Sequence, residues 1–455
     1  MAKFGPEAKP TSQPKLRAAI AAAEERREAV MAQLSARQTI LPLRYWRQQA
    51  HYTVPADKAD MARKALSSGT TPMARLMERF GISADDLAAK LELEASTVEE
   101  LLARPRPAPV VVLDAEDARA PGAAAAAAAL RNVVALLSEP PGPLAGVPPL
   151  RFFRPPRVRD PAGAGMLLRL LWALADGDSL ADRLPLDGIV VPKVDHPEEI
   201  ELLDRLLNDA EADLGLPGGS LRLALLVESG WAVAQLPELA RRAAPRLCAL
   251  IYGPVDHAAD IGLPAISATH PVALAARASI VGVAGAVGVP AIDGMTLAYP
   301  VADPAIERPA NHELFLERVA LAYRDAREGR ALGMLGKWVG HPAQLFAALL
   351  AFEQEFVAER LASDGTRLEA SLRAAADGRG ATIIETGMND RATERHVRAV
   401  LRQAVAVGRF DPDRALELGV LEPFELDEAR MLHAASSRSS DDAPSSGVGA
   451  SHGAG

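Results

Sequence analysis

The stretch that decides the fold is LRLALLVESGWAVAQLPELARRAAPRLCALIYGPVDHAADIG, residues 221–262. Two short apolar runs, ALLV and LCALIYGPV, flank a segment with helical spacing, and turn residues bound each run. Such runs are typical of parallel strands that are buried on both faces. The stretch therefore predicts a strand–helix–strand unit whose two strands lie in one parallel sheet.

An acidic residue follows each of these two predicted strands, Glu228 after the first and Asp256 after the second. Because neighbouring parallel strands end at the same edge of a sheet, we expect the two carboxylates to lie close together. Mg²⁺ prefers oxygen ligands and is commonly bound by one or two carboxylates and several waters. The pair therefore predicts a Mg²⁺ site. The alternative is that Glu228 caps a helix and Asp256 closes a turn.

The bulk composition bounds the class of protein. The 455 residues suffice for about three domains, or for fewer if one is a barrel of about 250 residues. A net charge of −9 argues against a general nucleic-acid binder. The single cysteine, Cys248, excludes an internal disulfide and indicates a reducing compartment. With no secretory signal pattern and no apolar run of membrane-spanning length, we expect a cytoplasmic protein without membrane contact.

Composition shifts divide the chain into four predicted parts. Residues 1–105 are expected to form an all-helical N-terminal extension, and the stiff linker RPRPAP then leads into a catalytic domain over 106–350. Residues 351–426 are predicted to form a helical lid and oligomerisation segment. The Ser-, Gly-, Ala- and Asp-rich residues 427–455 are predicted to be a disordered tail.

Within the extension, residues 73–103 resemble the helix-turn-helix of repressor-like domains. The charges oppose DNA binding, because seven acidic residues face four basic ones when Arg104 is counted. The second helix carries Glu99 and Glu100 and no basic residue before Arg104. A helix without cations cannot neutralise phosphates in a DNA groove. We interpret the segment as a helical docking or packing module and do not expect nucleic-acid binding.

Buried strands alternate with helical segments along the rest of the chain. The expected strands are Val110–Leu113, a short strand within LRFFRPPRV, Ile189–Val191, the two central strands, one within VGVPAIDG and Lys337–Val339. This alternation indicates an α/β fold with a parallel sheet. Polar residues recur at the carboxyl ends of the strands, and no GxGxxG follows the first one. These features favour a (β/α)₈ TIM barrel over an open nucleotide-binding sheet.

Six motifs, in order, resemble those of the HpcH/HpaI aldolase and citrate lyase β-subunit family, which includes malyl-CoA and citramalyl-CoA lyases. They are LDAEDA, VVPKVDHPEE, LLVESG, IYGPVDHAADIG, GKWVGHPAQ and GRGATIIETGMND. The match spans roughly residues 110–420. The resemblance implies a TIM barrel that carries a Mg²⁺-dependent carbon–carbon lyase or aldolase.

The resemblance also implies roles for single residues. Glu228 and Asp256 match the metal-binding carboxylates of the family. Arg154 matches its second-strand arginine, which holds keto-acid oxygens and stabilises an enolate. The family shows Arg-Val/Ile-Asn there, whereas this chain reads Arg-Pro-Pro-Arg, so Arg151 remains a rival.

Further candidates come from the other motifs. Glu116 and Asp117 match acidic positions near the water shell of the metal, although a structural salt bridge explains an acidic cluster equally well. Lys193 is a candidate substrate contact or a neutralising charge, and His341 is a candidate CoA contact or a helix cap. Asp390 matches an acid that transfers a proton to or from the acyl carbon in the site of a neighbouring subunit. Its alternative role is to cap the helix that follows.

The leading hypothesis is a Mg²⁺-dependent lyase that cleaves a malyl-CoA-like or citramalyl-CoA-like thioester, or condenses in reverse. One alternative is an aldolase on free hydroxy-keto acids, and another is a non-catalytic barrel that serves as a binding or regulatory module. The expected partners are an acyl-CoA or hydroxy-keto acid substrate and further copies of the chain, in a trimer or hexamer by family resemblance.

Overall fold

The structure is a computed structural model. It describes residues 17–18, 20–28, 41–139, 146–175, 184–354, 356–378, 382–384, 387–389 and 391–441. Contacts within the chain separate two units, residues 1–40 and residues 41–455. The described residues of the first unit are helical, and the barrel lies wholly in the second.

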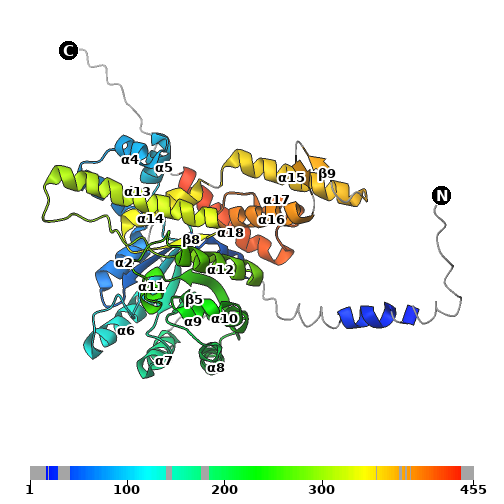
Figure 1. Cartoon of the computed structure of the whole chain (residues 1–455), viewed down its shortest axis with the longest axis horizontal. Coiled ribbons are helices and arrows are strands. Elements are labelled where there is room, and N and C mark those ends of the chain that lie inside the picture. The colour runs from blue at the N-terminus through cyan, green and yellow to red at the C-terminus, as the bar shows by residue number, and fades with distance from the viewer. Residues whose placement is uncertain are drawn as a thin grey trace, which may run out of the picture. The chain divides into compact units, whose positions relative to one another are not determined.

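Eight parallel strands close into a barrel (Figure 1). They are β1 (Ala50–Pro55), β2 (Val110–Asp114), β3 (Leu150–Arg154), β4 (Gly188–Val191), β5 (Arg222–Val227), β6 (Leu247–Tyr252), β7 (Ala291–Asp293) and β8 (Gly336–Val339). Strand β1 closes the ring, because it pairs with β2 on one side and with β8 on the other. The predicted (β/α)₈ barrel is confirmed.

The strand β1 corrects the prediction of an all-helical extension over residues 1–105. Its sequence, AHYTVP, contains the polar His51 and Thr53 and ends in proline, so it lacks the continuous apolar run that marks strands such as β2 and β5. His51 is nevertheless fully buried in the barrel, where its ring stacks on Trp338 and meets the edge of Phe152. The barrel therefore begins near residue 50, and the sequence prediction missed one of its strands.

Helices follow the strands and cover the outside of the barrel. They are α6 (Ala123–Ser138), α7 (Pro161–Ala175), α8 (Pro197–Asp213), α9 (Gly230–Ala234), α10 (Leu236–Ala243), α11 (Pro254–Asp260), α12 (Pro271–Val287), α13 (Arg308–Leu332) and α14 (Pro342–Glu353). In α10 the buried residues are Leu236, Leu239, Ala240 and Ala243, a spacing that presents one apolar stripe to the core. Among the described residues, no helix is both long and apolar enough to cross a membrane.

Four helices lie between β1 and β2: α2 (Ala59–Ser68), α3 (Pro72–Phe80), α4 (Ala84–Leu91) and α5 (Ala95–Ala103). The last three form the helix-turn-helix-like segment, and they pack on α13 and α14. Phe80 stacks on Phe315 of α13 with ring centroids 4.3 Å apart, and Lys90 forms an ion pair with Glu313. The α5 helix, which would read DNA in a repressor, contacts α14 instead. The segment is thus a packing module of the barrel wall.

The C-terminal segment builds a second apolar core. It contains α15 (Ala358–Ala376), an antiparallel pair of β9 (Thr382–Ile384) and β10 (Gly387–Asn389), α16 (Arg391–Ala406), α17 (Pro412–Glu417) and α18 (Leu426–Asp441). Leu43, from a short 3₁₀ helix that precedes β1, packs into this core with Leu401 and Leu432. The residues before the barrel and those after it therefore share one core.

The helix α18 corrects the prediction of a disordered tail that starts at residue 427. Although its sequence turns to Ser and Ala, its first half buries Ala429 and Leu432 against the second core. The predicted tail lies outside the described residues only from residue 442 on. The lid and oligomerisation role of residues 351–426 stays a prediction.

Candidate active site

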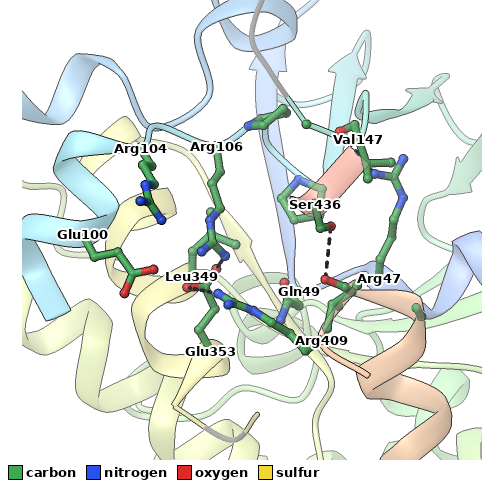
Figure 2. A pocket seen from close by; sticks show the side chains of 16 residues that line it. Arg47, Gln49, Glu100, Arg104, Arg106, Val147, Leu349, Glu353, Arg409 and Ser436 are labelled. Carbon is green, nitrogen blue, oxygen red and sulfur yellow. Dashed lines mark hydrogen bonds and ion pairs between the residues drawn. The ribbon is translucent and has the colours of Figure 1, made fainter. Parts of the chain in front are cut away.

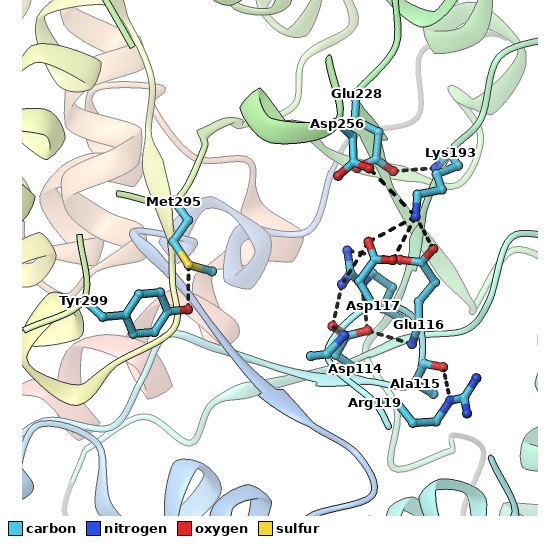
Figure 3. A network of polar contacts seen from close by, with 12 residues as sticks. Asp114, Ala115, Glu116, Asp117, Arg119, Lys193, Glu228, Asp256, Met295 and Tyr299 are labelled. Carbon is cyan, nitrogen blue, oxygen red and sulfur yellow. Dashed lines mark hydrogen bonds and ion pairs between the residues drawn. The ribbon is translucent and has the colours of Figure 1, made fainter. Parts of the chain in front are cut away.

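Charged side chains gather at the carboxyl ends of neighbouring barrel strands (Figure 3). Asp114 and Arg154 are the last residues of β2 and β3, Lys193 follows β4, Glu228 follows β5, and Asp256 lies in the first turn of α11 after β6. Their approach follows from the fold, because parallel strands of a barrel end at the same face. The barrel thus brings together residues that are up to 142 positions apart.

Arg154 is held by Asp114. Its Nε donates to Asp114 Oδ1 at 2.8 Å and its Nη2 to Asp114 Oδ2 at 2.5 Å, and both side chains are buried. The backbone N–H groups of Glu116 and Ala118 also donate to the Asp114 carboxylate, at 2.9 and 3.1 Å. Burial by itself lowers the pKa of Arg154, but the attraction of Asp114 outweighs it and raises that pKa. The guanidinium is therefore a fixed, permanent charge at the barrel mouth.

Arg151 points elsewhere. Successive side chains of a strand face opposite sides, so Arg151 and Arg154, three residues apart, cannot share a face. The Nη1 of Arg151 donates to the carbonyl oxygen of Leu137, near the end of α6, at 3.0 Å. The structure thus places Arg154, and not Arg151, beside the acidic cluster.

Lys193 contacts acidic residues from two parts of the barrel mouth, Glu116 and Asp117 after β2, and Glu228 and Asp256 after β5 and β6. Its Nζ donates to Glu116 Oε1 at 2.6 Å and to Asp117 Oδ1 at 2.9 Å, and it lies 3.9 Å from Asp256 Oδ1. Its backbone N–H donates to Glu228 Oε1 at 2.7 Å. Lys193 adopts φ +50°, a left-handed conformation that costs a non-glycine residue roughly 1–2 kcal/mol. Such strain is typical of functional sites. Here it occurs at a residue that contacts Glu116 with its side chain and Glu228 with its backbone N–H.

The acids at the mouth are crowded. Burial raises the pKa of Glu228 from 4.5 to about 8, and the negative charge of Asp256 adds to the rise. Burial likewise raises the pKa of Glu116 to about 7, with a further contribution from Asp117. Gly253 permits this crowding, because a Cβ at that position would come within 2.5 Å of Glu228 Cβ.

A cation fits this cluster. Among the described residues, five carboxylates, those of Asp114, Glu116, Asp117, Glu228 and Asp256, face two cations, Arg154 and Lys193. The Oε2 of Glu116 is buried and has no hydrogen-bond partner among the described residues, although Arg154 Nη1 lies 3.6 Å from it. An added positive charge would offset the excess of carboxylates and give the Glu116 oxygen a partner.

The donors also indicate which kind of cation fits. Within the described part of the chain, no group of three or more His, Cys, Asp or Glu side chains is arranged to hold a metal by itself. An ion here would therefore take Glu228 and Asp256 as protein ligands and complete its shell with water and substrate. An all-oxygen set with several waters suits Mg²⁺ better than Zn²⁺.

Two further predicted site residues have different outcomes. His341 precedes α14 and caps it, since its Nδ1 accepts a hydrogen bond from the N–H of Ala343 at 3.2 Å. Burial lowers the pKa of His341 to about 4, so the ring is neutral at pH 7. The capping alternative describes the contact that the structure shows, and a CoA contact stays a prediction. Asp390 lies outside the described residues.

The sequence prediction did not single out two side chains that contact Arg154, those of Asp114 and Trp338, or Tyr299, which contacts Met295 apart from the charged cluster. Asp114 belongs to the motif LDAEDA, but its role depends on its direct pairing with Arg154 in the β2–β3 register. The Cζ of Arg154 lies 5.5 Å from the ring centroid of Trp338, a cation–π distance. Tyr299 donates its hydroxyl hydrogen to the sulfur of Met295 (Figure 3). Asp114 could have been singled out as the residue that ends its strand, whereas Trp338 and Tyr299 gave no sequence signal.

Comparisons with known proteins identify the relatives of this chain. Residues 114–434 match the family described as Domain of unknown function (DUF6986). A citrate lyase subunit beta-like protein of Deinococcus radiodurans is 31% identical over 304 residues, which cover 64% of this chain and 88% of that protein. The chain belongs to the HpcH/HpaI and citrate lyase β-subunit family.

Other members of this citrate lyase β-subunit family agree with that assignment. An L-malyl-CoA/beta-methylmalyl-CoA lyase of Haloarcula marismortui is 27% identical over 278 residues, or 56% of this chain and 75% of that enzyme. A citrate lyase crystal structure from Burkholderia xenovorans has a TM-score of 0.51 at 22% identity and covers 71% of this chain and 91% of its own. This likeness shows the shared fold. The names of the relatives agree with the predicted enzyme class, a carbon–carbon lyase.

Proposed function

We propose that this protein is a Mg²⁺-dependent lyase that cleaves a carbon–carbon bond of a β-hydroxyacyl-CoA, such as a malyl-CoA-like or citramalyl-CoA-like thioester, or forms that bond in reverse. The observation that carries the proposal is the buried Arg154, fixed by Asp114 beside the acidic cluster of Glu116, Glu228 and Asp256. The names of the malyl-CoA lyase relatives support the choice of a CoA thioester.

Glu228 and Asp256 would hold the metal. Bound Mg²⁺ would lower the pKa of the substrate hydroxyl group during cleavage and polarise the attacked carbonyl group during condensation. The surplus of carboxylates at the barrel mouth supports this role.

Arg154 binds the negatively charged carboxylate and enolate oxygens of the reacting substrate. Cleavage removes the proton of the β-hydroxyl group, breaks the adjacent carbon–carbon bond and leaves its electron pair on the acyl-CoA fragment as an enolate. A guanidinium suits the carboxylate and enolate oxygens because it is planar, permanently charged and presents paired donors. The two hydrogen bonds from Asp114 fix the plane of Arg154 before substrate arrives, so little reorganisation remains to be done in the transition state.

The remaining side chains position charge and transfer protons. Lys193 holds Glu116 and Asp117 in place and keeps its own charge close to Asp256. Asp390, contributed by a neighbouring subunit, donates the proton that converts the enolate into the shorter acyl-CoA product. A homo-oligomer in the cytoplasm, a trimer or a hexamer, is therefore part of the proposal.

A substrate panel tests this function. The purified protein with Mg²⁺ should release a keto acid from malyl-CoA or citramalyl-CoA, EDTA should stop the reaction, and Arg154→Lys should be nearly inactive. Turnover of free 2-keto-4-hydroxy acids with no turnover of the thioesters would instead indicate an aldolase. If neither the thioesters nor the free hydroxy-keto acids react, and the wild-type protein is as inactive as Arg154→Lys on every substrate, the barrel is a binding or regulatory module.

A further inference from the structure

A polar cavity lies at the end of the barrel opposite the acidic cluster (Figure 2). Its volume is about 280 Å³, many times the roughly 10–15 Å³ that one water needs by the same measure. Gln49 immediately precedes β1, and Pro107 and Pro109 immediately precede β2, so the cavity opens at the amino ends of these strands. The acidic cluster lies at their carboxyl ends, so this cavity is separate from the candidate active site.

Four arginines line the cavity, and their charge is only partly compensated. They are Arg47, Arg104, Arg106 and Arg409, against the carboxylates of Glu100 and Glu353. Arg106 forms an ion pair with Glu353, and Arg409 Nη2 lies 3.6 Å from the same carboxylate. Among the described residues, Arg47 and Arg104 form no ion pair with any acid. The cavity therefore carries a surplus of positive charge.

Arg47 is the least compensated of these groups. It is 9% exposed, and within the described part of the chain its two Nη atoms donate to the carbonyl oxygens of Val147 and Pro148 and to no carboxylate. Its Nε is buried with no hydrogen-bond partner in the described part of the molecule. Burial lowers the pKa of Arg47 to about 10, which reflects how poorly this environment tolerates the bare charge. The carboxylates of Asp187 and Glu428 offset only part of the cost of burying this cation, and a bound anion would offset more of it.

An unused neutral donor accompanies these cations. Gln49 is also 9% exposed and lines the cavity, and its Nε2 has no hydrogen-bond partner among the described residues. Figure 2 shows Arg47 on one side of the cavity, and Arg104 and Arg106 on the other. Cations on two sides and a free amide between them are what a small molecule with two negative charges requires.

We propose that this cavity binds a small dianion, a phosphate or a dicarboxylate, with Arg47, Arg104 and the amide of Gln49 as its main contacts. The ligand would join three parts of the chain: the residues just before β1, the linker after α5, and the turn at residues 407–409 after α16 with Ser436 of α18. The site is therefore built to fasten the C-terminal helices to the barrel. It does not depend on the reaction that the opposite face catalyses.

The test uses calorimetric titration of the full chain in low-chloride buffer with inorganic phosphate and, separately, with succinate. We expect saturable binding of at least one probe with a stoichiometry of one per chain. The probe that binds more tightly distinguishes a phosphate site from a dicarboxylate site. Hydrogen exchange should slow at the amides of Arg104 and Arg106 and in residues 404–409 when that probe is present.

Matched variants locate the binding. Arg104→Gln, which breaks no ion pair of the described fold, should weaken binding at least tenfold, and Arg409→Gln serves as a second variant should the first fail to fold. Arg205→Gln removes a charge from an exposed pair on α8 and should leave the affinity within twofold. Arg154→Lys should also leave it unchanged. Absence of saturable binding by both probes, or loss of binding in Arg154→Lys but not in Arg104→Gln, overturns the proposal.

Discussion

Asp114 holds Arg154 through two parallel hydrogen bonds, of 2.8 and 2.5 Å, across the carboxyl ends of β2 and β3. The two residues are direct neighbours in the strand register. Removal of one partner of a buried pair costs about 3–5 kcal/mol, and for loss of Asp114 the looser contacts of Arg154 with Glu116 and Asp117, at 3.6 and 4.0 Å, offset part of that cost. This pair sets the position of the only arginine that the described structure places in the acidic cluster.

We expect Arg154→Lys to lower kcat/KM by about 10²–10⁴-fold, because an ammonium group cannot bond both oxygens of Asp114 and also present paired donors to substrate. Arg151→Lys is the matched control on the same strand, and it should be milder because that side chain contacts Leu137 outside the site. Steady-state kinetics of the two variants would reassign the arginine if the order were reversed.

We expect Glu228→Gln and Asp256→Asn each to abolish Mg²⁺-dependent activity while the circular dichroism spectrum stays unchanged. Each variant removes one of two proposed anionic ligands, and loss of even an outer-shell partner costs about 10–100-fold in metal affinity. Turnover measured at limiting Mg²⁺ checks this. Near wild-type turnover in either variant would refute the metal assignment.

The pH dependence of stability should report on Glu228. Its pKa in the folded chain is raised from 4.5 to about 8, so its protonated form favours folding. This contribution is complete below pH 4.5 and is lost as the pH rises through 8. At about 1.4 kcal/mol per pKa unit it amounts to a few kcal/mol. In EDTA, the free energy of unfolding should therefore fall between pH 6 and 9.

Two comparisons isolate this effect. Glu228→Gln has no carboxyl group at this position, so in EDTA it should lose less stability over the same range. Mg²⁺ should stabilise the wild-type protein more at pH 9 than at pH 6, because the ion binds the ionised carboxylates. Denaturant titrations that show equal pH slopes for both proteins would contradict the role of Glu228.

Asp390 is expected to act in the site of a neighbouring subunit. Inactive Asp390→Asn and inactive Glu228→Gln subunits, once mixed and reassembled, should then regain partial activity, because some mixed sites carry both intact groups. Activity of verified mixed oligomers measures this. Recovery that never exceeds the two parents would rule out a shared site.

The helix-turn-helix-like segment is expected not to bind DNA. Its α5 helix packs on α14 and its α4 helix packs on α13, where Lys90 is paired with Glu313. Titration of the full chain with duplex DNA at several salt concentrations should show no salt-sensitive affinity. Micromolar, salt-dependent binding would overturn this expectation.

The sequence by itself determined the fold class and the metal-binding candidates. A parallel strand buried on both faces leaves a local signature, an apolar run bounded by turns, and β2, β4, β5 and β6 show it. Glu228 and Asp256 were recognisable for the same reason, since each directly follows such a run. The strand β1 lacks the signature, because a barrel interior accommodates the polar ring of His51 that an isolated strand would expose.

The tertiary structure alone decided which charges meet. Strand register pairs Asp114 with Arg154, and the alternation of side chains along β3 turns Arg151 away from them. Barrel closure also places Arg47 and Gln49 of the first strand region against arginines from the linker after α5 and from the turn after α16. These contacts are non-local: their energy depends on burial and distance between segments far apart in the chain, and no local pattern of residues encodes either quantity.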